Sequence, residues 1–481
     1  MLYHSTRSDK APVDSAQAVL EGLAPDGGLY MPQAIPAFDW KKCLEGSSMD
    51  MATDILSALL PDIPDMPELV KKAYTGKFET DDLTPTVSVG GFHVLELFRG
   101  PTSAFKDVAL SMLPQLLTAA KNAKGMDKDI LILTATSGDT GKAALEGFHD
   151  VPGVRICVFY PHGGVSQVQR AQMVTQEGNN VAVCAVHGNF DDAQTGVKNI
   201  FAACQGKELP FALSSANSIN IGRLAPQVMY YFRSYRDLMD AGKIRIGDEV
   251  NFSVPTGNFG DILAGYLAKR LGLPVGKLIC ASNANNVLTD FIRSGTYDRR
   301  RKLLKTTSPS MDILVSSNLE RLLYLLSMDT ELVAKLMADL NGQGCYTVPD
   351  SLKEAIQAEF WSACCDDRRA DEVMGRVYKD LGYLCDPHTA AGWAAAEDYV
   401  AATGDDRPMV VLSTASPYKF PVAVLSAIGG DLSGSEFDQM ARLQAITGVP
   451  IPAPLASLQG KEERHTGVIE KEKMLHYVLS L

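Results

Sequence analysis

The chain has 481 residues, enough for two or three domains with several hydrophobic cores. Hydrophobic residues make up 46% and charged residues 21%, proportions typical of a soluble globular protein. The 45 basic and 57 acidic residues give a net charge of −12, which argues against a broad nucleic-acid or anionic-membrane surface, so any anionic ligand needs a local site.

The cysteines and the first residues indicate a cytoplasmic location. The nine cysteines include no Cys-x-x-Cys pair and no histidine cluster accompanies them, so we expect reduced thiols and no metal site. Residues 1–12 lack an apolar signal core, and the early Asp9 and Asp14 are atypical of a transit peptide. No apolar stretch reaches bilayer length. We therefore expect a cytoplasmic protein that is neither secreted nor membrane-spanning.

Residues 1–92 form the first expected unit, set apart by length and composition. A turn-rich segment, APDGGLYMPQAIP, precedes a helical run near Met51–Leu60. Prolines at positions 61, 64 and 67 follow that run and indicate a break before the next unit.

Residues 93–481 alternate short apolar runs with amphipathic helical segments, the pattern of βα units around a mainly parallel sheet. We predict an α/β fold in which ligands bind at loops beyond the carboxyl ends of the strands. The stretch from about 290 to 380 breaks the alternation and is predicted to be a helical insertion. Its basic run, residues 299–305, is more typical of a solvated face than of an anion site. The candidate strands are Val94–Phe98, Ile130–Leu133, Arg155–Tyr160, Val181–Val186, Glu249–Val254, Lys277–Ala281 and Met409–Leu412.

The first unusual loop lies in Leu97–Leu113, LFRGPTSAFKDVALSML, after a predicted strand. Gly100 and Pro101 turn the chain, and a helix is expected to start near Ser103, which places Lys106 in its first turn. The positive end of the helix dipole lowers the pKa of a lysine there, which suits an amine that must attack an aldehyde or remove a proton. On position alone, a surface lysine is the commoner interpretation.

The second loop, in ILILTATSGDTGKAALEGF, also follows a predicted strand. A nucleotide P-loop is excluded, because two residues instead of four separate its glycines and Ala143 follows Lys142. The hydroxyls and backbone amides at Ser137, Asp139 and Thr140 are suited to binding a carboxylate, and helix capping by Ser137 or Asp139 is compatible with that role.

The third loop, Gly257–Asp261, separates a predicted strand from a predicted helix. Its glycines let backbone amides approach an anion at a helix start, although an ordinary βα turn is the alternative. Two later segments carry further cations. In SANSINIGRLAPQ, Arg223 can grip a phosphate or serve as a surface or salt-bridge residue. In STASPYKF, Lys419 either binds phosphate or faces solvent.

Taken in order, these motifs resemble the threonine synthase family of pyridoxal-phosphate (PLP) enzymes. GPTSAFKD is similar to the family's lysine motif. The family order continues from residue 5 to about residue 420. The resemblance implies a fold-type II PLP enzyme, similar to the tryptophan synthase β subunit, with an N-terminal domain (1–92) before two α/β subdomains (within 93–481) around the cofactor. The supporting segments are STRS, GLAPDGGLYMP, TATSGDTGKAA, SANSINIGRLAPQ, PTGNFGD, SPSMDILVSSNLERLL, CDPHTAAGWAA and STASPYKF.

The resemblance also implies roles for individual residues. Lys106 is expected to carry PLP covalently and to act as the catalytic base, and the Thr414 hydroxyl is expected to face the pyridine nitrogen and moderate the electron sink. Asp261 is expected to act through its backbone amide or as a helix cap, because its carboxylate repels a phosphate. The PLP phosphate is assigned to Gly257, Asn258, Phe259, Gly260 and Asp261, the substrate carboxylate to Ser137, Gly138, Asp139 and Thr140, and the substrate phosphate to Asn217, Ser218, Asn220 and Arg223.

Two positions depart from the family pattern. Arg99 stands where LFHGPT has histidine, and Ser416 stands where STAHPAKF has histidine. The implied activity converts O-phospho-L-homoserine and water to L-threonine and phosphate. A phospholyase that releases 2-oxobutyrate, ammonia and phosphate from the same substrate shares every motif, and the two departures leave it open.

A non-catalytic binding protein is the more distant alternative. The sequence argues against it, because it keeps Lys106, the glycine loop at 257–261 and Thr414, the residues that the resemblance assigns to the cofactor. We expect a monomer or a dimer with a small-molecule substrate and no nucleic-acid or membrane partner.

Overall fold

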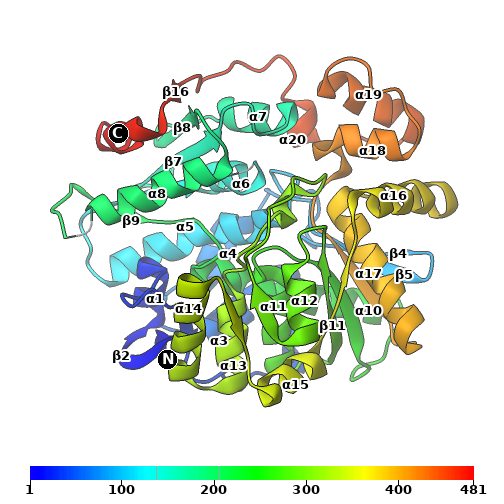
Figure 1. Ribbon diagram of the computed structural model, residues 1–481, viewed down its shortest axis with the longest axis horizontal. Coiled ribbons are helices and arrows are strands. Elements are labelled where there is room, and N and C mark those ends of the chain that lie inside the picture. The colour runs from blue at the N-terminus through cyan, green and yellow to red at the C-terminus, as the bar shows by residue number, and fades with distance from the viewer. Residues whose placement is uncertain (137, 205) are drawn as a thin grey trace.

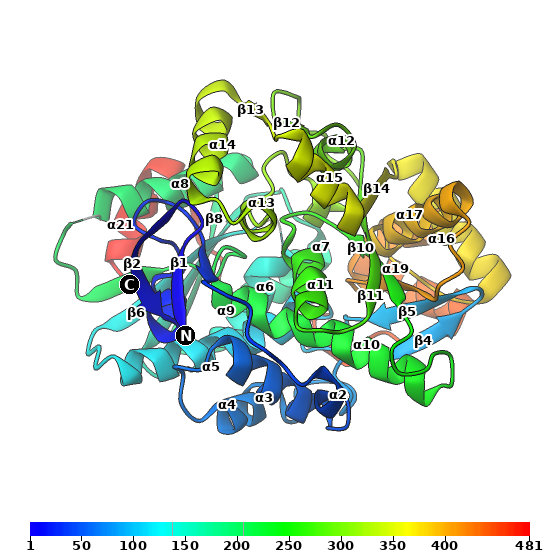
Figure 2. The ribbon, with the colours of Figure 1, turned by 90° about the horizontal axis from the view of Figure 1, so that it is seen from below.

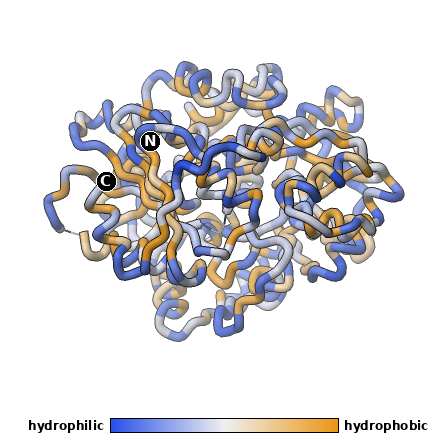
Figure 3. The backbone as a smooth tube through the Cα atoms, turned by 90° about the horizontal axis from the view of Figure 1, so that it is seen from above, coloured by the Kyte–Doolittle hydropathy of each residue, from blue (hydrophilic) through white to orange (hydrophobic). Residues whose placement is uncertain are grey.

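The computed structural model describes residues 1–136, 138–204 and 206–481. Two parallel sheets organise it, with a smaller N-terminal unit at one side (Figure 1). The tube in Figure 3 shows apolar segments running through the interior and hydrophilic segments concentrated in the outer turns. Among the described helices, none has both the length and the apolar character that crossing a membrane requires.

The N-terminal unit begins with a small antiparallel sheet in the order β2-β1-β3. Its helices bury one apolar face each, and α3 starts with a capping box in which Ser47 and Asp50 bond each other's backbone. The helical run predicted near Met51–Leu60 is confirmed in α3. The elements are β1 (Leu2–Ser5), β2 (Ser8–Asp14), α1 (Ser15–Glu21), β3 (Tyr30–Pro32), α2 (Trp40–Cys43), α3 (Ser48–Leu59) and α4 (Met66–Tyr74).

The larger sheet has six strands in the order β14-β11-β10-β15-β5-β4. All neighbours are parallel except β4, which pairs antiparallel with β5. Since β4 and β5 share this sheet, it contains residues on both sides of the predicted boundary at residue 92. The strands are β4 (Thr86–Val89), β5 (Phe92–Glu96), β10 (Val250–Pro255), β11 (Val275–Ser282), β14 (Phe360–Cys364) and β15 (Met409–Ser413).

The second sheet has five parallel strands in the order β16-β8-β7-β6-β9. All seven strands predicted from the apolar runs are confirmed, in this sheet or the larger one. In Figure 1 the long helix α5 runs between the two sheets, and it packs on α6, α4 and α1. The strands are β6 (Asp129–Ala135), β7 (Val154–Pro161), β8 (Val181–Val186), β9 (Phe211–Ser214) and β16 (Val468–Ile469).

The stretch near 290–380 is mostly helical, as predicted, but it also contains β14, which extends the larger sheet beside β11, and the small pair β12 (Thr296–Asp298) and β13 (Cys345–Thr347). The α-helices after the N-terminal unit are α5 (Lys106–Ala123), α6 (Asp139–Phe148), α7 (Gln167–Val174), α8 (Phe190–Cys204), α9 (Ile221–Leu224), α10 (Met229–Asp240), α11 (Gly260–Arg270), α12 (Val287–Ser294), α13 (Leu319–Ser327), α14 (Thr330–Gln343), α15 (Asp350–Glu359), α16 (Asp367–Leu381), α17 (Pro387–Thr403), α18 (Pro421–Ala427), α19 (Glu436–Thr447), α20 (Ala453–Ala456) and α21 (Met474–Leu479).

Candidate active site

The lysine loop leaves the carboxyl end of β5 and enters α5, whose first residue is Lys106. The helix starts three residues later than Ser103, because the Asp107 carboxylate accepts hydrogen bonds from the amide and hydroxyl of Thr102 and closes the loop. Ser103 itself is left-handed, with φ of 59°. The Phe105 amide donates to the Thr414 carbonyl at 2.8 Å, which ties this loop to the end of β15. Lys106 therefore lies in the first helical turn, as predicted.

Lys106 is almost completely buried, with its Nζ 3.8 Å from Asp139 Oδ2 and 4.4 Å from the centre of the Phe105 ring. Burial lowers the pKa of Lys106, because the charged ammonium loses its hydration. The positive charges of Lys419 and Arg223 lower the pKa further, whereas Asp139 opposes them. The expectation of a lowered pKa is confirmed, but desolvation is its main cause.

Asp139 is held between two lysines. Lys419 is fully buried; its Nζ lies 2.8 Å from Asp139 Oδ1 and donates to the Thr102 carbonyl at 3.0 Å. Gln169 donates to the same carboxylate oxygen at 3.0 Å. These contacts hold the pKa of Asp139 well below its usual range in spite of burial. The alternative that Lys419 faces solvent is wrong, because its ammonium is enclosed as the partner of Asp139.

The loop after β6 presents backbone amides. Gly138 has φ of 139°, and a Cβ there would lie 2.5 Å from the Gln169 side chain, so glycine is required. The Thr136 hydroxyl accepts from the amides of Gly138 and Gly141. The amides of Asp139 and Thr140 donate to no described residue, which leaves them available to a carboxylate. Ser137 lies outside the described residues, and the carboxylate role of this loop stays a prediction.

The loop after β10 turns its amides outward because its carbonyls are already bonded. Ser316 donates to the Gly257 carbonyl at 2.8 Å, and the amide of Asn318 donates to the Asn258 carbonyl at 3.0 Å. The amides of residues 257–260 donate to no described residue, and they surround the start of α11. Phe259 has φ of 62°, which completes the turn. This arrangement is that of an anion-binding loop.

Asp261 follows the same loop, and it is buried. Its carboxylate accepts a hydrogen bond from the Ile262 amide at 2.9 Å. The alternative that Asp261 caps the helix is wrong, because Asp261 is the second residue of α11 and the N-cap position is held by Phe259 without a side-chain bond. Desolvation raises the pKa of Asp261 to about 7, with the Ile262 amide and the charge of Lys106 opposing it. The carboxyl group therefore carries a proton over much of the acidic range, which weakens its repulsion of a nearby phosphate.

The segment after β9 contains a buried cation, Arg223, that pairs with no anion among the described residues. Arg223 donates to the Ala216 carbonyl, its Nε has no hydrogen-bond partner among the described residues, and desolvation lowers its pKa to about 10. A buried guanidinium in this state favours an anionic ligand. Ser218 lies in the same region, since its β-carbon is 4.0 Å from the position that a Cβ on Gly260 would take.

The two asparagines of that segment differ. Asn220 is bonded on both sides of its amide, to the Val19 carbonyl and the Gly222 amide, so it fixes the start of α9. The Asn217 side chain forms no hydrogen bond with a described residue, whereas its backbone amide bonds Ser215. The substrate roles of both residues stay predictions.

The two residues that depart from the family pattern differ in burial: Arg99 is partly exposed, and Ser416 is buried. Arg99 pairs with Glu96 and Glu79, so its charge is neutralised. Ser416 is fully buried two residues after Thr414, and its hydroxyl accepts from the Tyr418 amide while its own amide donates to the Ser103 carbonyl. Among the hydrogen bonds and ion pairs of the described residues, none joins either side chain to Lys106.

Sequence reasoning missed one buried pair beside the glycine loop. The His388 Nδ1 lies 2.6 Å from Asp386 Oδ2, and its Nε2 accepts from the Ser310 amide at 3.2 Å. A Cβ on Gly257 would lie 2.5 Å from the Ser310 carbonyl oxygen, so the pair supports the segment that packs on Gly257. The motif CDPHTAAG marked these residues, but only the fold shows what they contact.

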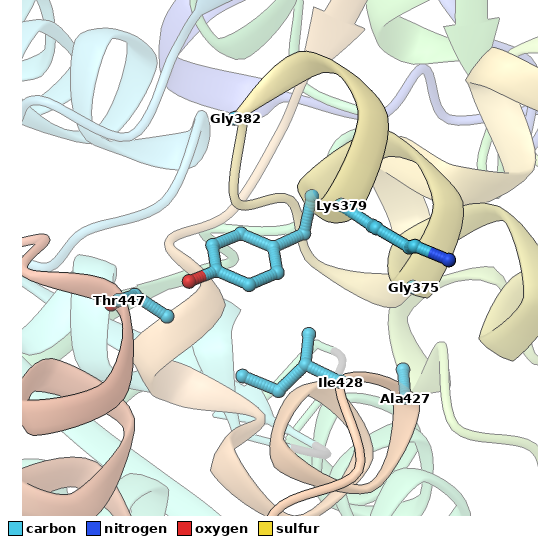
Figure 4. Close-up of a pocket in the computed structure, with 7 residues that line it drawn as sticks. Gly375, Lys379, Gly382, Ala427, Ile428 and Thr447 are labelled. Carbon is cyan, nitrogen blue, oxygen red and sulfur yellow. The ribbon is translucent and has the colours of Figure 1, made fainter.

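One pocket lies apart from the predicted site residues. A pocket of about 680 Å³ opens between α16, α18 and the end of α19, lined by Tyr378, Lys379 and Ile428 among others (Figure 4). None of its lining residues is a predicted site residue. Within the described ranges, no three His, Cys, Asp or Glu side chains are arranged to hold a metal ion.

The residues after the carboxyl ends of β5, β6, β9, β10 and β15 fit PLP. At the start of α11, amides that donate to none of the described residues suit its phosphate. A buried lysine of lowered pKa suits its aldehyde, and the buried Thr414 lies beside the lysine loop. Arg223 provides a second place for an anion.

Comparison with known proteins agrees with this geometry. Residues 79–415 match the family model described as pyridoxal-phosphate dependent enzyme, so the chain is a PLP-dependent enzyme of fold type II. Residues 2–74 match the model for the threonine synthase N terminus, and residues 389–478 match the threonine synthase C-terminal model. The chain belongs to the threonine synthase family.

Individual relatives support the assignment. The threonine synthase of Pseudomonas aeruginosa is 39% identical over 97% of this chain and 95% of its own length. Human threonine synthase-like 1 is 38% identical over 86% of this chain, which spans only 58% of that protein. The PLP-bound threonine synthase from Brucella melitensis superposes with a TM-score of 0.88 at 37% identity, covering 100% of this chain and 99% of that one.

Proposed function

We propose that this chain is a threonine synthase that converts O-phospho-L-homoserine and water to L-threonine and phosphate. The observation that carries the proposal is Arg223, a buried cation with no anionic partner among the described residues. The amides of the loop 257–260, which donate to none of those residues, add a separate anion site. A PLP enzyme needs one anion site for its cofactor phosphate and one for the substrate carboxylate, so a further one at Arg223 indicates a substrate that itself carries phosphate.

The residues divide the chemistry among them. PLP, when bound, supplies an electron sink for the carbon next to the substrate amino group. Lys106 in its neutral form removes the proton from that carbon and later returns one, and its lowered pKa favours that neutral form. The amides of Asp139 and Thr140 orient the substrate carboxylate, and Arg223 holds the phosphate that leaves.

The direct test is incubation of the PLP-loaded protein with O-phospho-L-homoserine, with phosphate, threonine and 2-oxobutyrate measured together. Phosphate and threonine in equal amounts support the proposal. Lys106→Ala is expected to abolish turnover, whereas Lys124→Ala, which removes a partly exposed lysine paired with Asp14, is expected to keep it. Threonine formation by Lys106→Ala would contradict the assigned role.

A phospholyase is the second candidate, because Ser416 departs from the family pattern two residues after Thr414. It shares the proton transfer at Lys106 and differs in the fate of the product. Release of 2-oxobutyrate and ammonia in place of threonine would favour it. A purified protein that gains no visible absorbance with added PLP would favour the non-catalytic alternative.

We further propose that the protein acts in the cytoplasm, as a monomer or a dimer, on this small-molecule substrate without a nucleic-acid or membrane partner. The net charge of −12 supports the last point, since it repels polyanions. Light scattering of the purified protein and fractionation of the source cells test these statements, and a larger assembly or a membrane-bound pool would contradict them.

A further inference from the structure

The segment from Ser316 to Arg321 joins two loops that come from different sheets. On one side, Ser316 donates to the Gly257 carbonyl and the Asn318 amide donates to the Asn258 carbonyl. On the other side, side chains of the segment bond the carbonyls of Ser218 and Ile219. The first loop is assigned to the cofactor phosphate and the second to the substrate phosphate.

Asn318 bonds both loops with one amide group. Its Nδ2 donates to the Ser218 carbonyl at 3.1 Å and to the Asn258 carbonyl at 3.1 Å, and the residue is fully buried. The same Nδ2 also lies near Gly260, since a Cβ on that residue would be 3.5 Å from it. The carbonyls of two loops therefore converge on one nitrogen atom.

The orientation of this amide is fixed by Arg321. A guanidinium only donates hydrogen bonds, so the atom that faces it must be the Asn318 oxygen, and Oδ1 accepts from it at 2.5 Å. The opposite atom, Nδ2, is thereby turned toward the two carbonyls. Arg321 is itself fully buried and donates to the carbonyls of Ile219 at 2.6 Å and Tyr30 at 3.2 Å.

The N-terminal unit braces this arrangement. Arg7 binds Glu320 through two hydrogen bonds of 2.8 Å, and Thr6 donates to the same carboxylate at 2.5 Å. Figure 2 shows the N-terminal strands β1 and β2 beside α13, the helix that contains Glu320 and Arg321. The start of α13 is therefore held from one side by the N-terminal unit while Asn318 bonds the two loops on the other.

We propose that Asn318 is a positioning residue that sets the distance between the cofactor-phosphate loop, Gly257–Asp261, and the substrate segment, Asn217–Arg223. The inference rests on the proposed function, which assigns an anion to each of these loops. By binding the carbonyls of both, Asn318 turns their free amides and Arg223 toward the ligands and fixes the substrate relative to the cofactor. Misplacement of about 1 Å at a distance from the chemistry is enough to lower rates by ~100-fold.

The test uses Asn318→Ala in the full PLP-loaded protein, with Asn251→Ala as the matched control. Asn251 is equally buried, and its amide is also bonded on both sides, to Asp405 and to the Lys277 backbone, but at the amino end of β10, away from the loop. Both variants lose a buried amide. Only Asn318→Ala is expected to lower kcat/KM for O-phospho-L-homoserine, by at least ~10-fold at saturating PLP.

The bound cofactor supplies a second measurement, since a residue that served only stability would not move it. Inorganic phosphate, added as the probe of the substrate anion site, is expected to change the absorbance spectrum of bound PLP in the wild type and in Asn251→Ala, and to lose that effect in Asn318→Ala. Asn318→Asp serves if the alanine variant fails to fold, because it keeps the Arg321 contact as an ion pair and removes the Nδ2 donor.

Each outcome decides the inference. Equal kcat/KM and equal spectral responses in the Asn318 variants and Asn251→Ala would overturn it, while the wild-type activity would leave the proposed function standing. A wild-type protein that neither retains PLP nor forms threonine would overturn the proposed function and this inference with it.

Discussion

Replacing Lys419 with methionine removes the ammonium that lies 2.8 Å from Asp139 and leaves a buried carboxylate with weaker support. Breaking a buried ion pair from one side costs about 3–5 kcal/mol. Asp139 keeps Lys106 at 3.8 Å and the Gln169 amide, so we expect the lower end of that range, about 3 kcal/mol. Double replacement by Lys419→Met and Asp139→Asn removes the uncompensated charge and is expected to recover most of the loss.

The assay is thermal unfolding of the PLP-free protein, because bound cofactor would mask the difference. An unfolding entropy of about 2.1 cal/mol/K per residue over 481 residues gives ~1 kcal/mol per degree, so Lys419→Met is expected to lower the Tm by at least about 3 °C. A Tm within about 1 °C of the wild type, or losses in the single variants that simply add in the double variant, would refute the reasoning.

The same variant has a consequence for reactivity. The positive charge of Lys419 lowers the pKa of Lys106, so its removal raises that pKa and increases the protonated fraction at neutral pH. The acidic limb of the pH profile for PLP attachment is expected to move to higher pH. If the acidic limb of the pH profile for PLP attachment lies at the same pH in the folded variant as in the wild type, Lys419 does not affect the pKa of Lys106.

Three further predictions follow from the site. Arg223→Gln is expected to raise KM for O-phospho-L-homoserine by at least ~10-fold while PLP retention is unchanged, and an unchanged KM would remove Arg223 from the substrate site. The pKa of Asp261 rises from its ordinary value of 3.8 to about 7, so the folded state keeps a proton that the unfolded state loses between pH 4 and 7. This contribution to the free energy of unfolding is complete below pH 4 and falls by roughly 4 kcal/mol in all as the pH rises to about 7. Asp261→Asn is therefore expected to show a smaller fall in Tm between pH 4 and 7 than the wild type. An identical pH dependence of Tm in the two proteins would contradict the raised pKa of Asp261. His388→Ala is expected to weaken PLP retention about 10-fold, because the Ser310 amide loses its acceptor. His388→Gln offers an acceptor oxygen in its place and is expected to retain PLP more nearly as the wild type does. Equal retention by the two variants would contradict a role for the contact with Ser310.

The parallel strands were predictable because buried strands form continuous apolar runs, such as residues 154–161 in β7. The parallel strands that escaped prediction lack that signal. β16 has two residues, and the partly buried β9 reads FALS without clear alternation. β14 lies within a helical stretch, and only its pairing with β11 reveals it as an edge strand.

Site residues could be predicted where they form a contiguous motif in the sequence, but not where their role depends on contacts with residues far away in the chain. Lys106 and the glycine loop at 257–261 are contiguous motifs, so their sequence alone suggested a role. Lys419 and Asn318 act on residues far away in the chain, and nothing in their own neighbourhood shows that one meets Asp139 and the other joins two loops. Such roles depend on tertiary contacts, which a single sequence does not display.

The strand pairing of β16 has a consequence for how the protein is made. The outer edge of β8 is covered at its carboxyl end by residues near 467–469, and the Gly467 carbonyl that accepts from the Cys184 thiol lies 283 residues further along the chain. At a synthesis rate of about 5–20 residues per second, that edge waits for tens of seconds or less with its backbone groups unpaired. Exposed strand edges recruit other strands, so the nascent chain carries its greatest risk of self-association during this interval.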